Sequence, residues 1–111
     1  MDLSFPKSHR LRTTADFKRV YDAKRSAADG RLIVYALANG LTHARLGISA
    51  SRKVGNAVKR NRYKRWFREA FRLSQHELPR MDFILLPRPG VMATFEEYRV
   101  SLQNLVRRLG A

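Results

Sequence analysis

The stretch VGNAVKRNRYKRWFREAFR, residues 54–72, decides how the fold is interpreted. Seven of its nineteen residues are basic, and one tryptophan, one tyrosine and two phenylalanines stand among them. On a helical wheel of about 100° per residue, the aromatic side chains gather on one side and the basic ones on the other. The stretch therefore predicts an amphipathic helix, from Val54 to Ser74, with one face packed on a core and a basic face exposed.

Two sets of side chains define the faces of this helix. The apolar face holds Tyr63, Trp66, Phe67, Ala70 and Phe71, and the basic face holds Arg60, Asn61, Lys64, Arg65, Arg68 and Arg72. A merely solvated face would mix both signs to gain i,i+4 ion pairs, yet Glu69 is the only acid in the stretch. We therefore interpret the basic row, which recurs about every 6 Å along the helix, as donors for nucleic-acid phosphates.

The residues before the helix extend this interpretation. Arg52 and Lys53 precede Gly55 and Asn56, so two cations and a flexible loop stand at a helix N-terminus, whose free N–H groups attract anions. The stretch is not a Walker loop, because the glycine spacing and the lysine-serine ending are absent. Asn61 is unusual inside a helix, where asparagine competes for backbone hydrogen bonds, so a contact role and chance both stay open.

The remaining elements are predicted from local signals. Thr13 or Thr14 caps a short helix. Residues 31–38, RLIVYALA, and residues 45–51, RLGISAS, predict an antiparallel pair of strands. Residues 83–86 predict a buried strand that Pro87 stops, and Thr94 caps a last helix. The order α-β-β-α-β-α predicts an α+β sandwich of helices on a small sheet.

Composition limits the classes of function. A chain of 111 residues with 44% hydrophobic content has room for one domain, which we expect over 1–111 with a flexible segment at 1–12. The net charge of +14 repels itself unless a polyanion binds. No apolar run approaches the roughly 20 residues that span a bilayer, so we expect no membrane association. The absence of cysteine excludes disulfides and thiolate sites, and it is compatible with a cytoplasmic location.

One face of the second strand is small and polar. Gly47, Ser49 and Ser51 alternate with apolar residues, so this face is either plain solvent-facing sheet or the floor of a groove. Three aromatic side chains are candidates to border such a groove: Phe17, Tyr21 and Tyr35. Aromatic rings beside cations are typical of single-stranded RNA binding. From the residues alone, core packing is the favoured interpretation for Phe17 and Tyr21.

The run SASRKVGNAVKRNRYKRWFREAFR, residues 49–72, closely resembles the signature of the bacterial ribonuclease P protein subunit. The segments HRLRTTADFKRVY, LIVYAL and DFILLPRP and the last helix also resemble this family in order and spacing. The resemblance implies a protein that joins a large catalytic RNA and helps it to remove the 5′ leader from precursor tRNA. It also implies that the RNA holds the catalytic Mg²⁺ ions, whereas the protein alone binds no cofactor or metal and contributes no catalytic residue.

The resemblance assigns roles by position. The side chains expected to contact the catalytic RNA are Arg60, Asn61, Arg62, Lys64, Arg65 and Arg68. The residues expected to line a cleft for the single-stranded leader are Phe17, Tyr21, Tyr35, Ser49, Ser51, Arg52 and Lys53, which favours the groove interpretation over the core. The free protein is expected to be a cytoplasmic monomer that binds RNA rather than DNA.

The resemblance also modifies the predicted fold. It implies an additional short strand near Lys24 to Ala28, which gives about four mostly antiparallel strands, three helices and the order αβββαβα. It further implies a left-handed β-α-β crossover, whereas general rules favour a right-handed one.

Three other classes of protein were weighed. A nuclease that carries its own catalytic groups is disfavoured, because His9, His43 and His76 lie in predicted loops without ligand spacing. A DNA-binding helix-turn-helix module lacks a compact first helix before the basic one. A ribosomal protein or RNA chaperone explains the charge equally well, but it predicts no selectivity for a 5′ leader.

Overall fold

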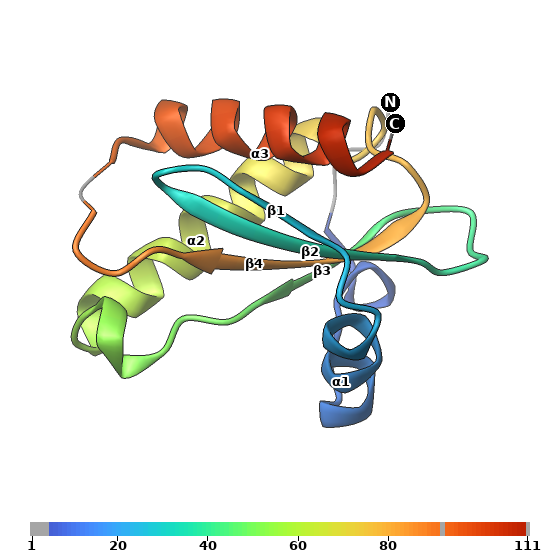
Figure 1. The fold of residues 1–111 in the computed structure, drawn as a ribbon, viewed down its shortest axis with the longest axis horizontal. Helices are drawn as coiled ribbons and strands as arrows, with labels where there is room; N and C mark the ends of the chain where they lie inside the picture. Colours follow the sequence, from blue (N-terminus) through green and yellow to red (C-terminus); the bar gives the residue numbers. More distant parts are fainter. Residues whose placement is uncertain (1–4, 92, 111) are drawn as a thin grey trace.

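Three helices and a four-stranded sheet make up the described part of this computed structural model, residues 5–91 and 93–110 (Figure 1). The elements are α1 (Thr14–Asp22), β1 (Ser26–Ala28), β2 (Leu32–Ala38), β3 (Arg45–Ile48), α2 (Ala57–Ser74), β4 (Met81–Pro87) and α3 (Phe95–Gly110). Two short 3-10 turns, η1 (Lys7–His9) and η2 (Arg52–Val54), precede α1 and α2. This order confirms the α+β class and the additional strand that the resemblance implied.

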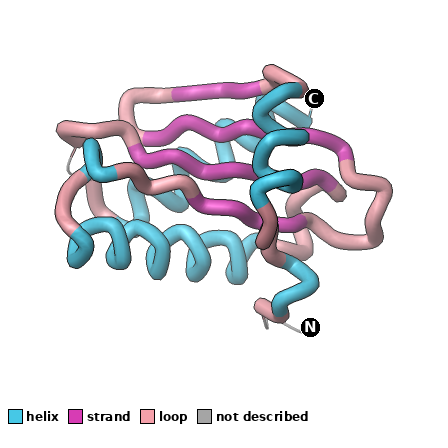
Figure 2. Tube along the Cα trace, turned by 90° about the horizontal axis from the view of Figure 1, so that it is seen from below, coloured by secondary structure: helices cyan, strands magenta, loops and turns pink. Residues whose placement is uncertain are grey.

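The sheet is mixed, with strand order β1-β2-β4-β3. β2 pairs antiparallel with β1 and β4, whereas β3 pairs in parallel with β4. The expected antiparallel pairing of residues 31–38 with 45–51 is therefore wrong, because β4 lies between the two strands. The apolar run of β4 is buried on both faces of the sheet, which favours a central place over an edge. α2 connects β3 to β4 by a left-handed crossover, as the resemblance implied (Figures 1 and 2).

The main core lies between the sheet and the helices α2 and α3, which cover the same side (Figure 1). Alternate residues of the two central strands point to this side, because side chains along a strand alternate between faces. The largest buried side chains here are Leu32, Phe67, Phe71, Phe83, Leu85, Tyr98, Leu102 and Leu105. The predicted apolar face of the basic helix is therefore confirmed as a packing surface, with Tyr63 and Trp66 partly buried at its margin.

α1 lies on the opposite face of the sheet. Its Val20 is fully buried against Ile84 of β4, and Leu11 completes this smaller cluster. The segment 1–12, for which we expected flexibility, is described from Phe5 onward; residues 1–4 lie outside the described residues. Within it, the Leu11 N–H donates to the Leu46 carbonyl at 2.8 Å, so this segment runs along the free edge of β3.

The helix starts follow the local capping signals. Thr13, one of the two expected caps, accepts a hydrogen bond from the Asp16 N–H at 3.1 Å. Thr94 and Glu97 form a reciprocal capping box at the start of α3. The basic helix begins three residues later than expected, because Asn56 caps it through the Lys59 N–H.

Candidate nucleic-acid interface

Among the described residues, the basic side chains of α2 from Lys59 to Arg68 carry charge that no nearby acid compensates, whereas Arg72 pairs with Glu69. Asn61, Arg62, Arg65 and Arg68 are exposed, and Arg60 and Lys64 are partly buried. Within residues 5–91 and 93–110, no cation from Arg52 to Arg68 forms an ion pair. Glu69 is held by Arg72, whose Nε donates to it at 3.0 Å and lowers the pKa of the Glu69 carboxyl. The face is therefore a strong attractor for a polyanion.

The opposite side of α2 fixes the rotation of this face. The Tyr63 hydroxyl donates to the Val91 carbonyl at 3.3 Å, and the Trp66 ring lies 6.3 Å from the Phe95 and Tyr98 rings between centroids. These contacts hold the aromatic side chains against α3 and the loop before it. The basic side chains are consequently presented away from the core in a defined orientation.

The turn before α2 presents Arg52 and Lys53 to solvent. Ser51 caps this turn by accepting a hydrogen bond from the Lys53 N–H at 3.3 Å. Gly55 then adopts φ +139°, a conformation that L side chains rarely take, and the Lys59 side chain packs within 2.7 Å of the place where a Cβ would stand. The glycine therefore allows the chain to turn sharply from η2 into α2.

The aromatic side chains expected to line a cleft share one face of the sheet. Phe17, Tyr21 and Tyr35 are partly buried around the Leu11, Val20 and Ile84 cluster. The Tyr21 and Tyr35 rings meet edge to face, with 4.9 Å between centroids. Figure 2 shows that α1 crosses the strands on this face and that, among the residues the structure describes, no other helix covers them there. We call this surface the open sheet face, defined by Phe17, Tyr21, Tyr35 and Ser49.

Gly47 brings α1 close to this face. A Cβ on Gly47 would lie 2.7 Å from Cζ of Phe17, so the ring rests directly on the strand backbone. Ser49 continues the strand, because its N–H donates to the Leu85 carbonyl at 3.0 Å. Ser51 and the cations after it stand apart from α1, at the turn where α2 begins (Figure 1). The expected cleft residues thus form two groups, one on the open sheet face and one at the η2 turn.

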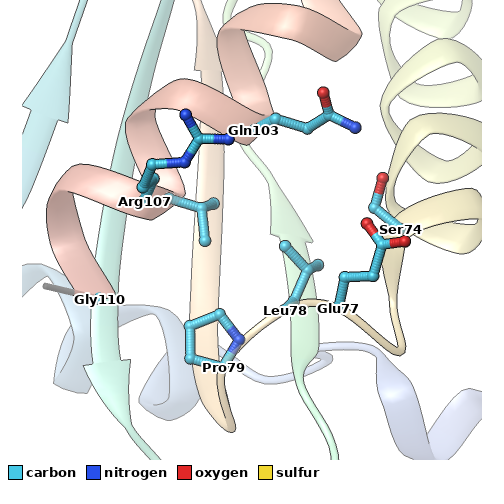
Figure 3. Close-up of a pocket in the computed structure, with 8 residues that line it drawn as sticks. Ser74, Glu77, Leu78, Pro79, Gln103, Arg107 and Gly110 are labelled. Atoms are coloured by element: carbon cyan, nitrogen blue, oxygen red, sulfur yellow. The ribbon is translucent and has the colours of Figure 1, made fainter.

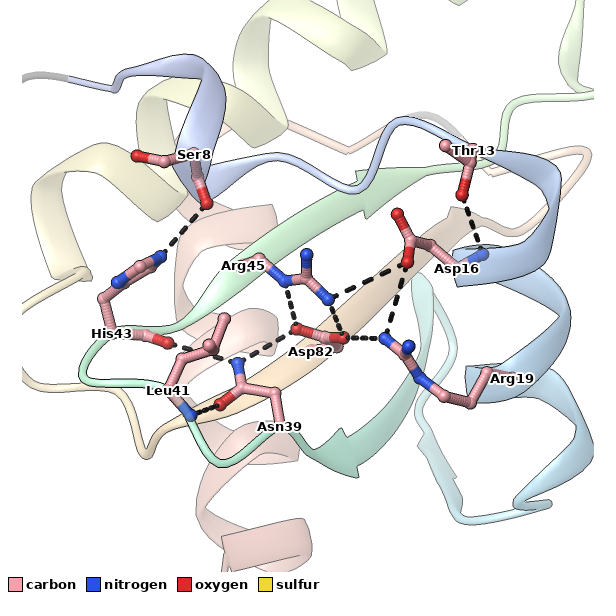
Figure 4. A network of polar contacts seen from close by, with 9 residues as sticks. All are labelled: Ser8, Thr13, Asp16, Arg19, Asn39, Leu41, His43, Arg45 and Asp82. Atoms are coloured by element: carbon pink, nitrogen blue, oxygen red, sulfur yellow. Dashed lines mark hydrogen bonds and ion pairs between the residues drawn. The ribbon is translucent and has the colours of Figure 1, made fainter.

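A buried carboxylate anchors α1 to the sheet (Figure 4). Asp82 of β4 is fully buried and accepts hydrogen bonds from Arg45 of β3, at 2.8 and 2.7 Å, and from Arg19 of α1, at 2.7 Å. Asn39 also donates to it, at 3.0 Å. Burial by itself raises the pKa of Asp82, but the hydrogen bonds of Arg45 and Asn39 outweigh it and lower the pKa below its ordinary value.

Sequence reasoning missed this network. The one indication in the sequence is Asp82, an acid inside the apolar run that forms β4. A buried carboxylate requires hydrogen-bond or ion-pair partners. The partners themselves come from three other segments of the chain, and their spacing in the sequence gives no indication that they meet. Asp82 therefore explains why α1 has a fixed place on the open sheet face.

Two of the recesses lined by described residues differ in their relation to the predicted interface. The smaller, about 170 Å³, lies beside β3, where Phe17 and Gly47 meet Lys64 and Arg68 of α2. The larger, about 790 Å³, lies between the ends of α2 and α3, away from the predicted RNA-binding residues (Figure 3). Its lining mixes one acid, Glu77, with Arg107 and apolar side chains. It has no pair of carboxylates for acid-base chemistry among its lining residues.

Two of the histidines are neighbours in the structure, which their distance in the sequence does not indicate. The rings of His9 and His43 lie 4.0 Å apart between centroids, and His43 Nε2 is 3.0 Å from the Ser8 carbonyl. They join the N-terminal segment to the loop before β3. Residues 5–91 and 93–110 contain no cluster of three or more His, Cys, Asp or Glu suited to a metal ion. Within the same residues, no helix is long and apolar enough to cross a membrane.

Comparisons of the sequence and the fold with known proteins all point to one family. The family model described as Ribonuclease P matches residues 5–110. A relative from Clostridioides difficile, named ribonuclease P protein component, is 38% identical over 109 residues, which cover 96% of each chain. The RNase P protein structure from Staphylococcus aureus has a TM-score of 0.83 and 36% identity, covering 92% of this chain and 95% of that one. The Thermotoga maritima RNase P protein gives a TM-score of 0.82 and 34% identity, covering 89% and 96%.

Proposed function

Because this chain belongs to the ribonuclease P protein family, we propose that it binds the ribonuclease P RNA and the 5′ leader of precursor tRNA. In that role it promotes the endonucleolytic removal of the leader, which makes the mature 5′ end of tRNA. The observation that carries the proposal is the row of unpaired basic side chains of α2 up to Arg68, held in a fixed orientation beside a sheet face with partly buried aromatic rings.

The basic face is the proposed contact with the catalytic RNA. Side chains one turn apart on a helix recur at about 5–6 Å, which suits the phosphates of a folded RNA. Arg65 and Arg68 are exposed and have no carboxylate partner among the described residues, so their guanidinium groups are available for bidentate phosphate contacts. Asn61 is exposed between two arginines, where an amide adds hydrogen bonds without further charge.

The open sheet face is the proposed contact with the leader. Single-stranded RNA is bound through stacking of its bases on aromatic rings and through cations that follow its backbone. Phe17 and Tyr35 offer partly exposed rings from α1 and β2, and Arg52 and Lys53 lie at the η2 turn. An RNA strand that runs from the open sheet face to the η2 turn contacts the aromatic rings first and the cations afterwards.

The chemistry in this proposal belongs to the RNA partner. The catalytic RNA would hold the Mg²⁺ ions and would supply the chemistry for hydrolysis of the phosphodiester bond. The protein acts by binding: its cations lower the repulsion between two polyanions, the RNA enzyme and its RNA substrate. The protein therefore reduces the concentration of magnesium that assembly and cleavage require.

The direct test is single-turnover cleavage of precursor tRNA by a bacterial ribonuclease P RNA at low magnesium, with and without the protein. We expect the protein to accelerate cleavage, and the acceleration to grow as the leader is lengthened across the open sheet face. Tight RNA binding without acceleration would instead favour a ribosomal protein or an RNA chaperone.

Two variants separate the proposed surfaces. Arg65→Ala should weaken assembly with the catalytic RNA. Phe17→Ala or Tyr35→Ala should weaken the binding of leader-bearing substrate by about 1–3 kcal/mol if a base stacks there. The measurement is the Kd of the assembled enzyme for precursor tRNA with and without its leader. An equal loss for both substrates would contradict the assignment of the aromatic side chains.

A further inference from the structure

Three cations from distant parts of the chain line the small recess beside β3. Lys64 and Arg68 lie one turn apart on α2, and Arg10 belongs to the N-terminal segment. The other lining side chains are apolar, among them Phe17 and Leu46, and no acid lines the recess. Neither Lys64 nor Arg68 has an ion pair within residues 5–91 and 93–110, because Glu69 is engaged by Arg72.

Arg10 is held in place without being neutralised. Its backbone bridges to Leu46 at the free edge of β3, so the segment cannot swing away without breaking that pairing. Its guanidinium lies 4.6 Å above the Phe5 ring, and Nη2 donates to the Phe5 carbonyl at 3.1 Å. Nε is buried without a hydrogen-bond partner among the described residues. A cation fixed in this way, with no carboxylate, favours an anion beside it.

The size of the recess limits what it holds. A volume of about 170 Å³ corresponds to the space of about five or six water molecules. It is well below the roughly 300 Å³ at which pockets for whole small-molecule ligands begin. A single phosphate group with a few waters fits this space and matches the three cations.

We propose that this recess is a specific binding site for one phosphodiester group of an RNA strand, with Arg10 as its third cation beside Lys64 and Arg68. The identity of the RNA in this inference rests on the proposed function. The existence of the phosphate site does not depend on it. The recess lies where Phe17 of the open sheet face adjoins the basic face of α2. A phosphate bound here fixes the RNA at the junction of the two surfaces, either as part of the catalytic RNA or as part of the leader.

The site is first tested without RNA. Arginine Nε–H signals are followed by NMR while inorganic phosphate is added, with sodium chloride at equal ionic strength as the reference. Arg12 serves as the internal control, because it is exposed two residues away and does not line the recess. We expect the Arg10 signal to move and saturate while that of Arg12 follows the chloride reference. Equal responses of the two arginines, or none, would overturn the site.

A double-mutant cycle then tests the RNA. Arg10→Gln, Lys64→Gln and the combined variant are compared for the Kd of the catalytic RNA and, in the assembled enzyme, of precursor tRNA with and without leader. If both cations hold one phosphate, the double variant loses at least about threefold less affinity than the product of the single losses. Coupling with the catalytic RNA or only with leader-bearing substrate identifies which strand is bound.

Controls separate contact from folding. Arg12→Gln removes the same charge outside the recess and should show no coupling with Lys64→Gln. Arg10→Lys keeps the charge and should recover much of the affinity. If the Arg10 contact with Phe5 had a purely structural role, the affinity losses of the Arg10 and Lys64 variants would be independent of each other. Independent losses for all RNAs would overturn the inference. Phosphate binding at Arg10 in a protein that fails to stimulate cleavage would refute the proposed function and retain the site.

Discussion

Gly47 illustrates how one missing side chain shapes the open sheet face. An alanine there would place Cβ within 2.7 Å of Phe17 and 3.1 Å of Leu11. We expect Gly47→Ala to cost about 1–3 kcal/mol of unfolding free energy through overpacking and to displace the Phe17 ring. Urea denaturation measures the stability, and the Kd for leader-bearing substrate measures the displacement. Gly30→Ala is the matched control, since a Cβ at Gly30 meets nothing within 4 Å.

The buried carboxylate of Asp82 makes a prediction about acid. Its pKa in the folded protein is lowered, against the opposing effect of burial, by Arg45 and Asn39. Its contribution to stability is therefore complete above the unfolded pKa, about 3.9, and is lost as the pH falls through the lower folded value. An NMR titration of the Asp82 carboxyl carbon should show protonation only below that pH. Protonation at or above it would contradict the network.

At the scale of elements, two ion pairs join α1 to the sheet, Arg19 with Asp82 at 2.7 Å and Asp16 with Arg45 at 3.9 Å. Arg19 donates to Asp82, whereas its neighbour Lys18 pairs only with Asp22 on the exposed side of the same helix. We expect Arg19→Gln to lower the unfolding free energy by about 1 kcal/mol and to weaken leader binding, because α1 carries Phe17. Lys18→Gln removes the same charge and should change neither the stability nor the leader dependence appreciably. Equal effects of both variants would show that charge alone matters.

The elements themselves were largely predictable, because their signals are local. Thr13, Thr94 and the apolar faces of the helices gave three helices close to their observed bounds. The start of α2 was placed too early, because the helical periodicity continues through Gly55, which the chain uses as a turn. The pairing of β3 was wrong for a different reason. Strand order depends on which apolar strand occupies the centre, and β4 lies more than thirty residues further along the chain.

The two faces of the basic helix were predictable from the sequence, but the arrangement of the candidate site around them was not. The wheel of residues 54–72 separated the basic face from the packing face correctly, since both follow from one periodicity. The fold places Phe17, Tyr21 and Tyr35 on one face of the sheet. Asp82 had no signal beyond residue type, because its partners lie more than thirty residues away. Arg10 had none toward Lys64 and Arg68, because those side chains belong to a helix far along the chain. The contacts of all these residues with RNA stay predictions.

At the scale of the whole molecule, the net charge of +14 predicts how binding depends on salt. If the protein neutralises about five phosphates, log K for the catalytic RNA should fall with log salt at a slope near −4. Filter binding or fluorescence titration at several potassium concentrations measures this slope. Arg65→Ala should reduce its magnitude by about 1. A flat salt dependence would contradict the electrostatic part of the proposed function.

The central position of β4 also has a consequence for biosynthesis. A ribosome completes α2 before it makes residues 81–87, so the most cationic helix leaves the exit tunnel while β3 still lacks its neighbour in the sheet. The sheet closes only when β4 inserts between strands that are already made, which is a pairing of high sequence separation and therefore slow. During this interval the nascent chain exposes the basic residues of α2 beside ribosomal RNA while the sheet that its apolar face packs against is still incomplete.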